Sequence, residues 1–125
     1  MRRSDQRRDA VFALYQRDVT DRALPELLAE ARPFTHELAE GTDGSLPELD
    51  AEISRLSRGW SIDRLGALER NILRVALYEL RHRDDIPAEV AVDEAVTLAQ
   101  RYCGAEAPGF VNGILGAAVR EEART

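Results

Sequence analysis

Apolar residues recur at the spacing of an α-helix along almost the whole of this 125-residue chain. The alternation of β-branched and polar residues that is typical of strands does not occur in the sequence. The broadest apolar stripe covers residues 67–83, where Leu73 and Leu77 widen it beyond one face. This helix is therefore expected to be central and packed on two sides. The pattern predicts an all-α fold, a compact bundle of about seven short helices arranged as two packed helical sub-bundles.

Capping and turn-forming residues divide this pattern into separate helices. Helices are expected over about residues 4–18, 21–31, 67–83, 90–102 and 109–122, and two shorter ones begin at Pro33 and Ser45. Ser4 is expected to cap the first of them. Two breaks are predicted, a turn at Gly41-Thr42-Asp43-Gly44 and an interruption at Gly59-Trp60-Ser61 with a short turn over 62–65.

The length fits one domain over residues 1–125, large enough for a hydrophobic core. Cys103 is the only cysteine, so no internal disulfide can form. No apolar run approaches the roughly 20 residues that span a bilayer. The start, Met1-Arg2-Arg3-Ser4-Asp5, is not followed by the apolar stretch of a secretory signal. These features predict a cytoplasmic protein without a membrane segment.

Charge separates the start of the chain from the rest. The net charge is −6, and a negatively charged protein is not expected to bind nucleic acid. Residues 1–17, however, contain five arginines and two aspartates, a local charge of +3, so the other 108 residues carry −9. This asymmetry suggests a basic face that binds a ligand, on a protein whose other surfaces are acidic and repel anions. An ordinary solvated helix start is the alternative that charge alone leaves open.

No set of side chains in the sequence has the spacing of a catalytic or metal site. His36 and His82, the only histidines, fall in different segments, and neither has a second ligand at metal spacing. Cys103 has no evident base partner, and the glycine-rich phosphate-binding and nucleophile motifs are missing. The sequence therefore predicts a binding protein that is not an enzyme and that needs no cofactor and no metal.

Three motifs and the front of the chain share a resemblance to one known family. The motifs are Glu69-Arg70-Asn71-Ile72-Leu73-Arg74-Val75-Ala76-Leu77-Tyr78-Glu79-Leu80, Pro87-Ala88-Glu89-Val90-Ala91-Val92-Asp93-Glu94-Ala95-Val96 and Gly109-Phe110-Val111-Asn112-Gly113-Ile114-Leu115. The front runs from Arg3 to Arg8 and on to Ala13-Leu14-Tyr15. In this order they resemble the NusB family of bacterial transcription antitermination factors. Residues 21–56 are similar to that family only in helical character.

The resemblance implies an all-helical pair of small bundles and a set of partners. NusB proteins pair with ribosomal protein NusE. Together the two bind the boxA element of nascent RNA and help RNA polymerase to resist termination, notably on ribosomal RNA operons. The same module occurs fused to RNA methyltransferases, but no such domain follows here, so the free factor fits better. The expected partners are boxA-type single-stranded RNA, NusE and the RNA polymerase antitermination complex.

The first helix carries the residues expected to contact RNA. Arg2, Arg3, Arg7 and Arg8 are each predicted to meet a backbone phosphate. Four such contacts give a log–log salt slope of about −3 on single-stranded RNA. Tyr15 is predicted to stack on a base or to touch the partner, with a place in the core as the alternative.

Tyr78 and Glu79 are the residues expected to contact the protein partner. The core explains Leu77 and Leu80 but does not require an acid at Glu79. A partner that binds RNA is expected to be basic, and an acidic residue beside a tyrosine suits such a partner. An ordinary exposed helix position is the alternative for Glu79. Ser4, Asp5 and Gln6 interrupt the basic cluster of the first helix. RNA affinity is therefore expected to depend strongly on the partner.

Two other functional hypotheses remain open at the level of sequence. The first is a helical scaffold that binds only protein or forms a homodimer. The glycines of the last helix, Gly109, Gly113 and Gly116, would allow the close backbone approach such an interface needs. The second is the detached regulatory domain of an enzyme, which a stoichiometric cofactor would reveal.

Overall fold

The computed structural model describes residues 2–57 and 65–123, and these residues form seven α-helices and no strand. The helices are α1 (Arg3–Thr20), α2 (Leu24–Leu27), α3 (Pro33–Gly44), α4 (Leu46–Leu56), α5 (Ala67–His82), α6 (Ala88–Tyr102) and α7 (Ala107–Ala123). The predicted all-α fold is confirmed. The break predicted at Gly59-Trp60-Ser61 and most of the turn predicted over 62–65 lie outside the described residues.

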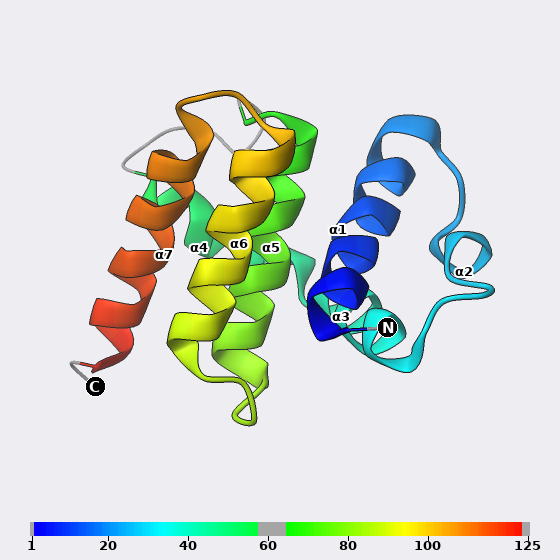
Figure 1. Ribbon diagram of the computed structural model, residues 1–125, viewed down its shortest axis with the longest axis horizontal. Helices are drawn as coiled ribbons and strands as arrows, with labels where there is room; N and C mark the ends of the chain where they lie inside the picture. The colour runs from blue at the N-terminus through cyan, green and yellow to red at the C-terminus, as the bar shows by residue number, and fades with distance from the viewer. Residues whose placement is uncertain (1, 58–64, 124–125) are drawn as a thin grey trace.

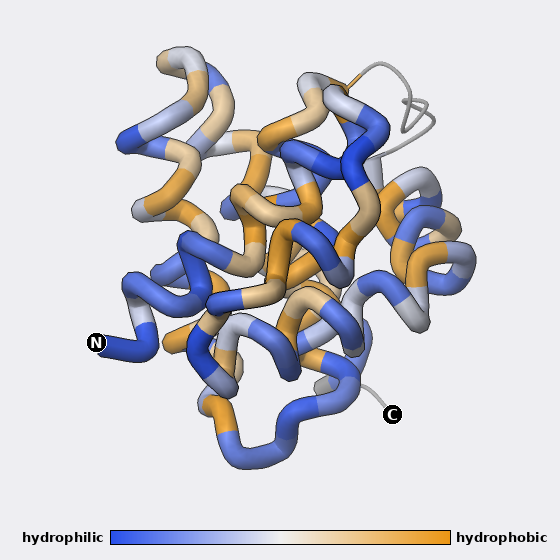
Figure 2. Tube along the Cα trace, turned by 90° about the vertical axis from the view of Figure 1, so that its right-hand side faces the viewer, coloured by the Kyte–Doolittle hydropathy of each residue, from blue (hydrophilic) through white to orange (hydrophobic). Residues whose placement is uncertain are grey.

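The helices form two sub-bundles that lie side by side, with α1 to α3 in one and α4 to α7 in the other (Figure 1). The helix between them is α5, which packs against α1 and α3 on one side and against α4, α6 and α7 on the other. Its residues Ile72, Leu73 and Leu77 are almost completely buried. Figure 2 shows apolar residues gathered where the helices meet. The expectation of a central helix packed on two sides is thus confirmed.

Proline determines where three of the helices begin. Pro25, Pro33 and Pro47 occupy the first turn of α2, α3 and α4, where a missing backbone N–H costs no helical hydrogen bond. The second helix is shorter than the predicted range 21–31, because only Leu24–Leu27 is helical. The chain after it is held by turns instead of continuing the helix.

The ends of α1 also differ from the prediction. Ser4 is not the cap, because α1 already begins at Arg3. The hydroxyl of Ser4 instead donates a hydrogen bond of 2.5 Å to Glu94 of α6. At the other end Asp21 has a φ of 60°, the left-handed conformation that commonly ends a helix.

The run Gly41-Thr42-Asp43-Gly44 is not the predicted turn but the last turn of α3. Thr42 is completely buried. A Cβ atom added at Gly41 would overlap the ring of Tyr78, so this glycine makes room for that ring. The glycine therefore marks a close approach between α3 and α5 and not a reversal of the chain.

The Gly41→Ala variant is expected to lose about 1–3 kcal/mol of unfolding free energy, because the added methyl group forces the Tyr78 ring to move. Gly44→Ala is the matched control, since it lies in the same helix and nothing is within 4 Å of the added carbon. Its stability should stay unchanged or rise by up to about 1 kcal/mol. Urea unfolding followed by circular dichroism measures both variants. Equal stabilities would contradict the close approach at Gly41.

Candidate nucleic-acid interface

Three of the four arginines predicted to contact phosphates lie on the surface at the start of α1. The side chains of Arg2, Arg3 and Arg8 are 84, 56 and 30 % exposed. These three residues are called the α1 arginine cluster below. All three lie at the N-terminal end of α1, with Arg3 beside Asp85 and Arg8 beside Asp5 and Asp9.

Each arginine of the cluster has a carboxylate at ion-pair distance. Arg2 Nε is 3.8 Å from Asp5, Arg3 Nη1 is 3.7 Å from Asp85, and Arg8 Nη2 is 3.1 Å from Asp9. Ion pairs between exposed side chains contribute little to stability, because water and salt screen them. A phosphate group can therefore replace these carboxylates at a small cost to the fold.

Arg7 is buried, and its side chain is only 4 % exposed. Its Nε donates to both carboxylate oxygens of Glu79 at 3.0 and 2.9 Å, and its Nη2 donates to Glu79 Oε1 at 2.7 Å. A further carboxylate, that of Glu94, lies 3.4 Å from Nη1. The guanidinium of Arg7, which was predicted to meet a backbone phosphate, is instead engaged in an ion pair in the interior.

Glu79 is buried as well, with 1 % of the residue exposed. It is therefore not the exposed acid that the sequence suggested beside Tyr78. Desolvation raises the pKa of the Glu79 carboxyl, and the hydrogen bonds from Arg7 oppose that rise. The bidentate Arg7–Glu79 pair joins α1 to α5, and so it connects the two sub-bundles beneath the α1 arginine cluster.

The ring of Phe34 in α3 holds several guanidinium groups near this pair. The guanidinium carbons of Arg3, Arg7 and Arg83 lie 4.4, 5.4 and 5.5 Å from the ring centroid. Such distances allow cation–π attraction. Phe34 thereby fixes the position of Arg3 in the cluster, whereas Arg2 extends into solvent.

A polar groove of about 310 Å³ separates the first two turns of α1 from α6. It is called the α1–α6 groove below. Cations and acids alternate along its walls, with a hydroxyl on each helix. Its lining consists of Arg2, Ser4, Asp5, Arg8, Asp93, Glu94, Thr97, Leu98 and Arg101. Two members of the α1 arginine cluster therefore face a shaped cavity and not a flat surface.

The two tyrosines named from the sequence lie in different places. Tyr15 is half-buried on α1, so the structure is compatible with either role proposed for it. Tyr78 is half-buried on α5, where its ring lies over Gly41 and stacks on His82 with the ring centroids 5.1 Å apart. Tyr78 and Glu79 do not form one exposed patch, since Glu79 points into the interior.

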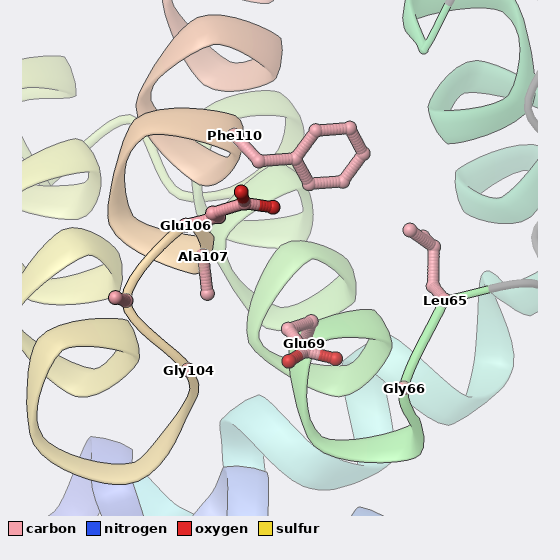
Figure 3. Close-up of a pocket in the computed structure, with 8 residues that line it drawn as sticks. Leu65, Gly66, Glu69, Gly104, Glu106, Ala107 and Phe110 are labelled. Atoms are coloured by element: carbon pink, nitrogen blue, oxygen red, sulfur yellow. The ribbon is translucent and has the colours of Figure 1, made fainter.

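A second hollow, of about 650 Å³, lies where the start of α5 meets the connection between α6 and α7 (Figure 3). Its lining consists of Leu65, Gly66, Glu69, Gly104, Ala105, Glu106, Ala107 and Phe110. The charged side chains among these residues are the carboxylates of Glu69 and Glu106. A hollow with acids and no cation in its lining disfavours a phosphate.

Cys103, next to this hollow, does not have the properties of a nucleophile. Desolvation raises the pKa of its thiol to about 11, and the negative charge of Glu69 adds to the rise. The thiol is therefore protonated near neutral pH. Among the described residues no group of His, Cys, Asp and Glu could hold a metal ion. Within that part of the chain, no helix is long and apolar enough to cross a membrane.

Sequence reasoning missed two residues at the far end of the α1–α6 groove. Arg101 lines the groove, and Tyr102 is 43 % exposed beside it. The signal that could have found them is the stripe of Asp93, Thr97 and Arg101 at four-residue spacing, which places polar groups on one helix face. An exposed tyrosine at the end of such a stripe has no role in the core.

Comparison with known proteins identifies the family. The sequence profile described as the NusB family matches residues 4–120. The transcription antitermination protein NusB of Rubrobacter xylanophilus is 43 % identical over 122 residues, which cover 92 % of this chain and 88 % of that protein. The protein of the same name from Halalkalibacterium halodurans is 41 % identical, with 92 and 91 % covered.

Solved structures agree with the sequence comparison. NusB of T. maritima superposes with a TM-score of 0.88 at 34 % identity, covering 97 % of this chain and 92 % of that one. A chain from a crystal structure of the antitermination factors NusB and NusE in complex with double-stranded RNA gives 0.82 at 28 % identity, with 92 and 93 % covered. The shared profile, the identities above 40 % and the common fold all lead to one conclusion: the chain belongs to the NusB family.

Proposed function

We propose that this chain is a transcription antitermination factor. It pairs with ribosomal protein NusE and binds boxA-type single-stranded RNA in nascent transcripts, notably those of ribosomal RNA operons. Through these contacts it joins the RNA polymerase antitermination complex in the cytoplasm. It works by binding and not by catalysis.

The α1 arginine cluster is the observation that supports this function most directly. The chain as a whole carries −6, yet Arg2, Arg3 and Arg8 all lie at the N-terminal end of α1 with only weak ion pairs. An acidic protein that keeps such a region can bind a polyanion there while its other surfaces repel it. The similarity to a NusB chain solved together with NusE and RNA supports the same proposal.

The residues predicted from the sequence take different parts in this proposal. Arg2, Arg3 and Arg8 meet phosphates, and Tyr15 supplies a ring at the edge of the same helix. Arg7 acts as a positioning residue, because its pair with Glu79 fixes α1 on α5. Tyr78 stays the residue proposed for the NusE surface, and Glu79 supports it from the interior.

Titration of a fluorescent boxA-type RNA at several salt concentrations tests the function. With NusE present, we expect tighter binding to this RNA than to a scrambled sequence. The α1 arginine cluster should contribute about −2 to the log–log salt slope, since three exposed arginines and not four are available for phosphates. The double variant Arg2→Gln/Arg8→Gln should bind more weakly and lower the magnitude of the slope by about 1.4.

Arg120→Gln is the control for these substitutions. Arg120 is exposed on α7 and makes no ion pair within the described residues, so its loss should leave both affinity and slope unchanged. Equal and weak binding to both RNAs, with or without NusE, would contradict the proposed function. Light scattering on the same samples would then show whether the chain forms a homodimer instead.

A further inference from the structure

A stripe of polar side chains on α6 faces the first turns of α1 and is not engaged by other residues. Asp93, Thr97 and Arg101 line the α1–α6 groove at four-residue spacing. None of the three makes a side-chain hydrogen bond or ion pair within the described parts of the chain. The other two acids that line the groove are engaged, because Glu94 of α6 accepts from Ser4 and Asp5 of α1 pairs with Arg8.

An exposed aromatic ring lies next to the end of this stripe. Tyr102 is 43 % exposed at the end of α6. The edge-to-face contact with Phe12 of α1, with ring centroids 5.0 Å apart, holds the ring in a fixed place. Tyr102 also lies close enough to Arg8 for an electrostatic interaction. The ring therefore lies on the side of α1 to which Arg8 belongs.

The helices α1 and α6 run in the same direction (Figure 1). Ser4 bonds to Glu94 in the first half of each helix, and Phe12 contacts Tyr102 further along both. The polar stripe from Asp93 to Arg101 spans eight residues of helix, which corresponds to about 12 Å. A groove of about 310 Å³ is large enough for a nucleotide and too small for a folded domain.

The chemistry of the stripe matches a nucleotide better than a bare phosphate. An unpaired nucleotide presents a flat base, an edge with both donors and acceptors, and a phosphate. Tyr102 offers a ring for stacking, and Thr97 offers a hydroxyl for the base edge. Arg101 offers a cation for the phosphate. The carboxylate of Asp93 would repel a ligand that consisted of phosphate alone.

We propose that the α1–α6 groove holds one unpaired nucleotide of a single-stranded RNA. Its base stacks on Tyr102 at the end of the groove, its phosphate lies at Arg101, and Thr97, one turn before Arg101, contacts the edge of the base. The inference rests on the RNA-binding function proposed above and adds contacts on α6 to those on α1. It also makes Tyr102 and Arg101 binding residues, which the charge of the first helix does not suggest.

The test is equilibrium binding of boxA-type RNA to the full chain together with NusE. Tyr102→Leu keeps an apolar side chain against Phe12 but removes the aromatic ring, and it should weaken binding at least about 5-fold. Tyr102→Phe keeps the ring and should bind like the wild type. Arg101→Gln should lower the magnitude of the salt slope by about 0.7, whereas Arg120→Gln should not.

A fluorescent base analogue locates the stacked nucleotide. With 2-aminopurine placed at successive positions of the RNA, one position should be quenched by the wild type and recover in Tyr102→Leu. Wild-type affinity in both Tyr102→Leu and Arg101→Gln would overturn the inference while the proposed function stands. No RNA binding by the wild type would overturn both. Weaker NusE binding by Tyr102→Leu without RNA would assign the groove to protein and also overturn the inference.

Discussion

The Glu79→Ala variant is expected to lose about 3–5 kcal/mol of unfolding free energy, because Arg7 loses its bidentate partner and its buried charge keeps only the carboxylate of Glu94, 3.4 Å from Nη1. The side chain of Arg7 is 4 % exposed, so water cannot take the place of the carboxylate. An arginine also keeps its proton under all ordinary conditions and cannot escape the penalty by becoming neutral. Chemical unfolding at pH 7 measures the loss.

Two further variants separate the buried charge from the loss of a contact. Glu26→Ala removes an exposed carboxylate that lies 3.0 Å from Arg22 and should change stability by no more than about 0.5 kcal/mol. The double variant Arg7→Met/Glu79→Leu removes both charges and should be more stable than Glu79→Ala alone. Wild-type stability of Glu79→Ala would show that the two sub-bundles do not depend on this pair.

The same burial changes how RNA-binding variants must be interpreted. Arg7→Glu would place two acids against each other between α1 and α5, and the protein should unfold in part or entirely. Loss of RNA binding in that variant would report on the fold and not on a phosphate contact. Arg2 and Arg8 are the arginines whose substitution tests the surface directly, since their side chains are 84 and 30 % exposed.

The sequence predicted the helices well wherever packing follows the periodicity of a single helix. The wide apolar stripe of α5 predicted a helix between two sub-bundles, and both of its sides are covered. Pro33 and Ser45 mark the starts of α3 and α4 as expected. These features are local, because a proline or a stripe restricts its own helix whatever the rest of the chain does.

The features that sequence reasoning missed depend on residues far apart in the chain. Arg7 and Glu79 are 72 positions apart, and each taken alone looks like a solvated charge. Gly41 looks like a turn until the ring of Tyr78 is placed against it. Tyr102 looks like the end of a core stripe until α1 is placed beside α6. The periodicity of a sequence shows which face of a helix is buried, but it does not show which arginine pairs with which carboxylate.

The variant Arg74→Met is expected to lose about 2–3 kcal/mol at pH 7. Nε and Nη2 of Arg74 each donate to an oxygen of Asp50 at 2.7 Å, and Nη1 donates to Asp18 at 2.9 Å. Methionine fills much of the same space but leaves both carboxylates without this partner. The loss is smaller than for Glu79→Ala, because the Asp18 and Asp50 side chains are 16 and 26 % exposed and keep some hydration.

The cost of Arg74→Met should also depend on pH. Desolvation by itself raises the pKa of Asp18, but the amide of Asn71 and the charge of Arg74 outweigh it, so the net pKa is lowered. A carboxylate whose pKa is lower in the folded state stabilises the fold above its unfolded pKa of about 3.9. That contribution is lost as the pH falls through the folded pKa. Wild type and Arg74→Met should therefore become more similar in stability below about pH 4.

Urea unfolding at pH 7 and pH 3 measures this dependence, and Asp18→Asn provides the matched control. Asparagine keeps the size of the side chain and leaves the Arg74–Asp50 pair in place, so this variant should lose less stability than Arg74→Met at pH 7. It should also show a weaker decline in acid, because the titrating group is gone. If Arg74→Met lost the same unfolding free energy relative to the wild type at both pH values, packing and not charge would hold Arg74 between α1, α4 and α5.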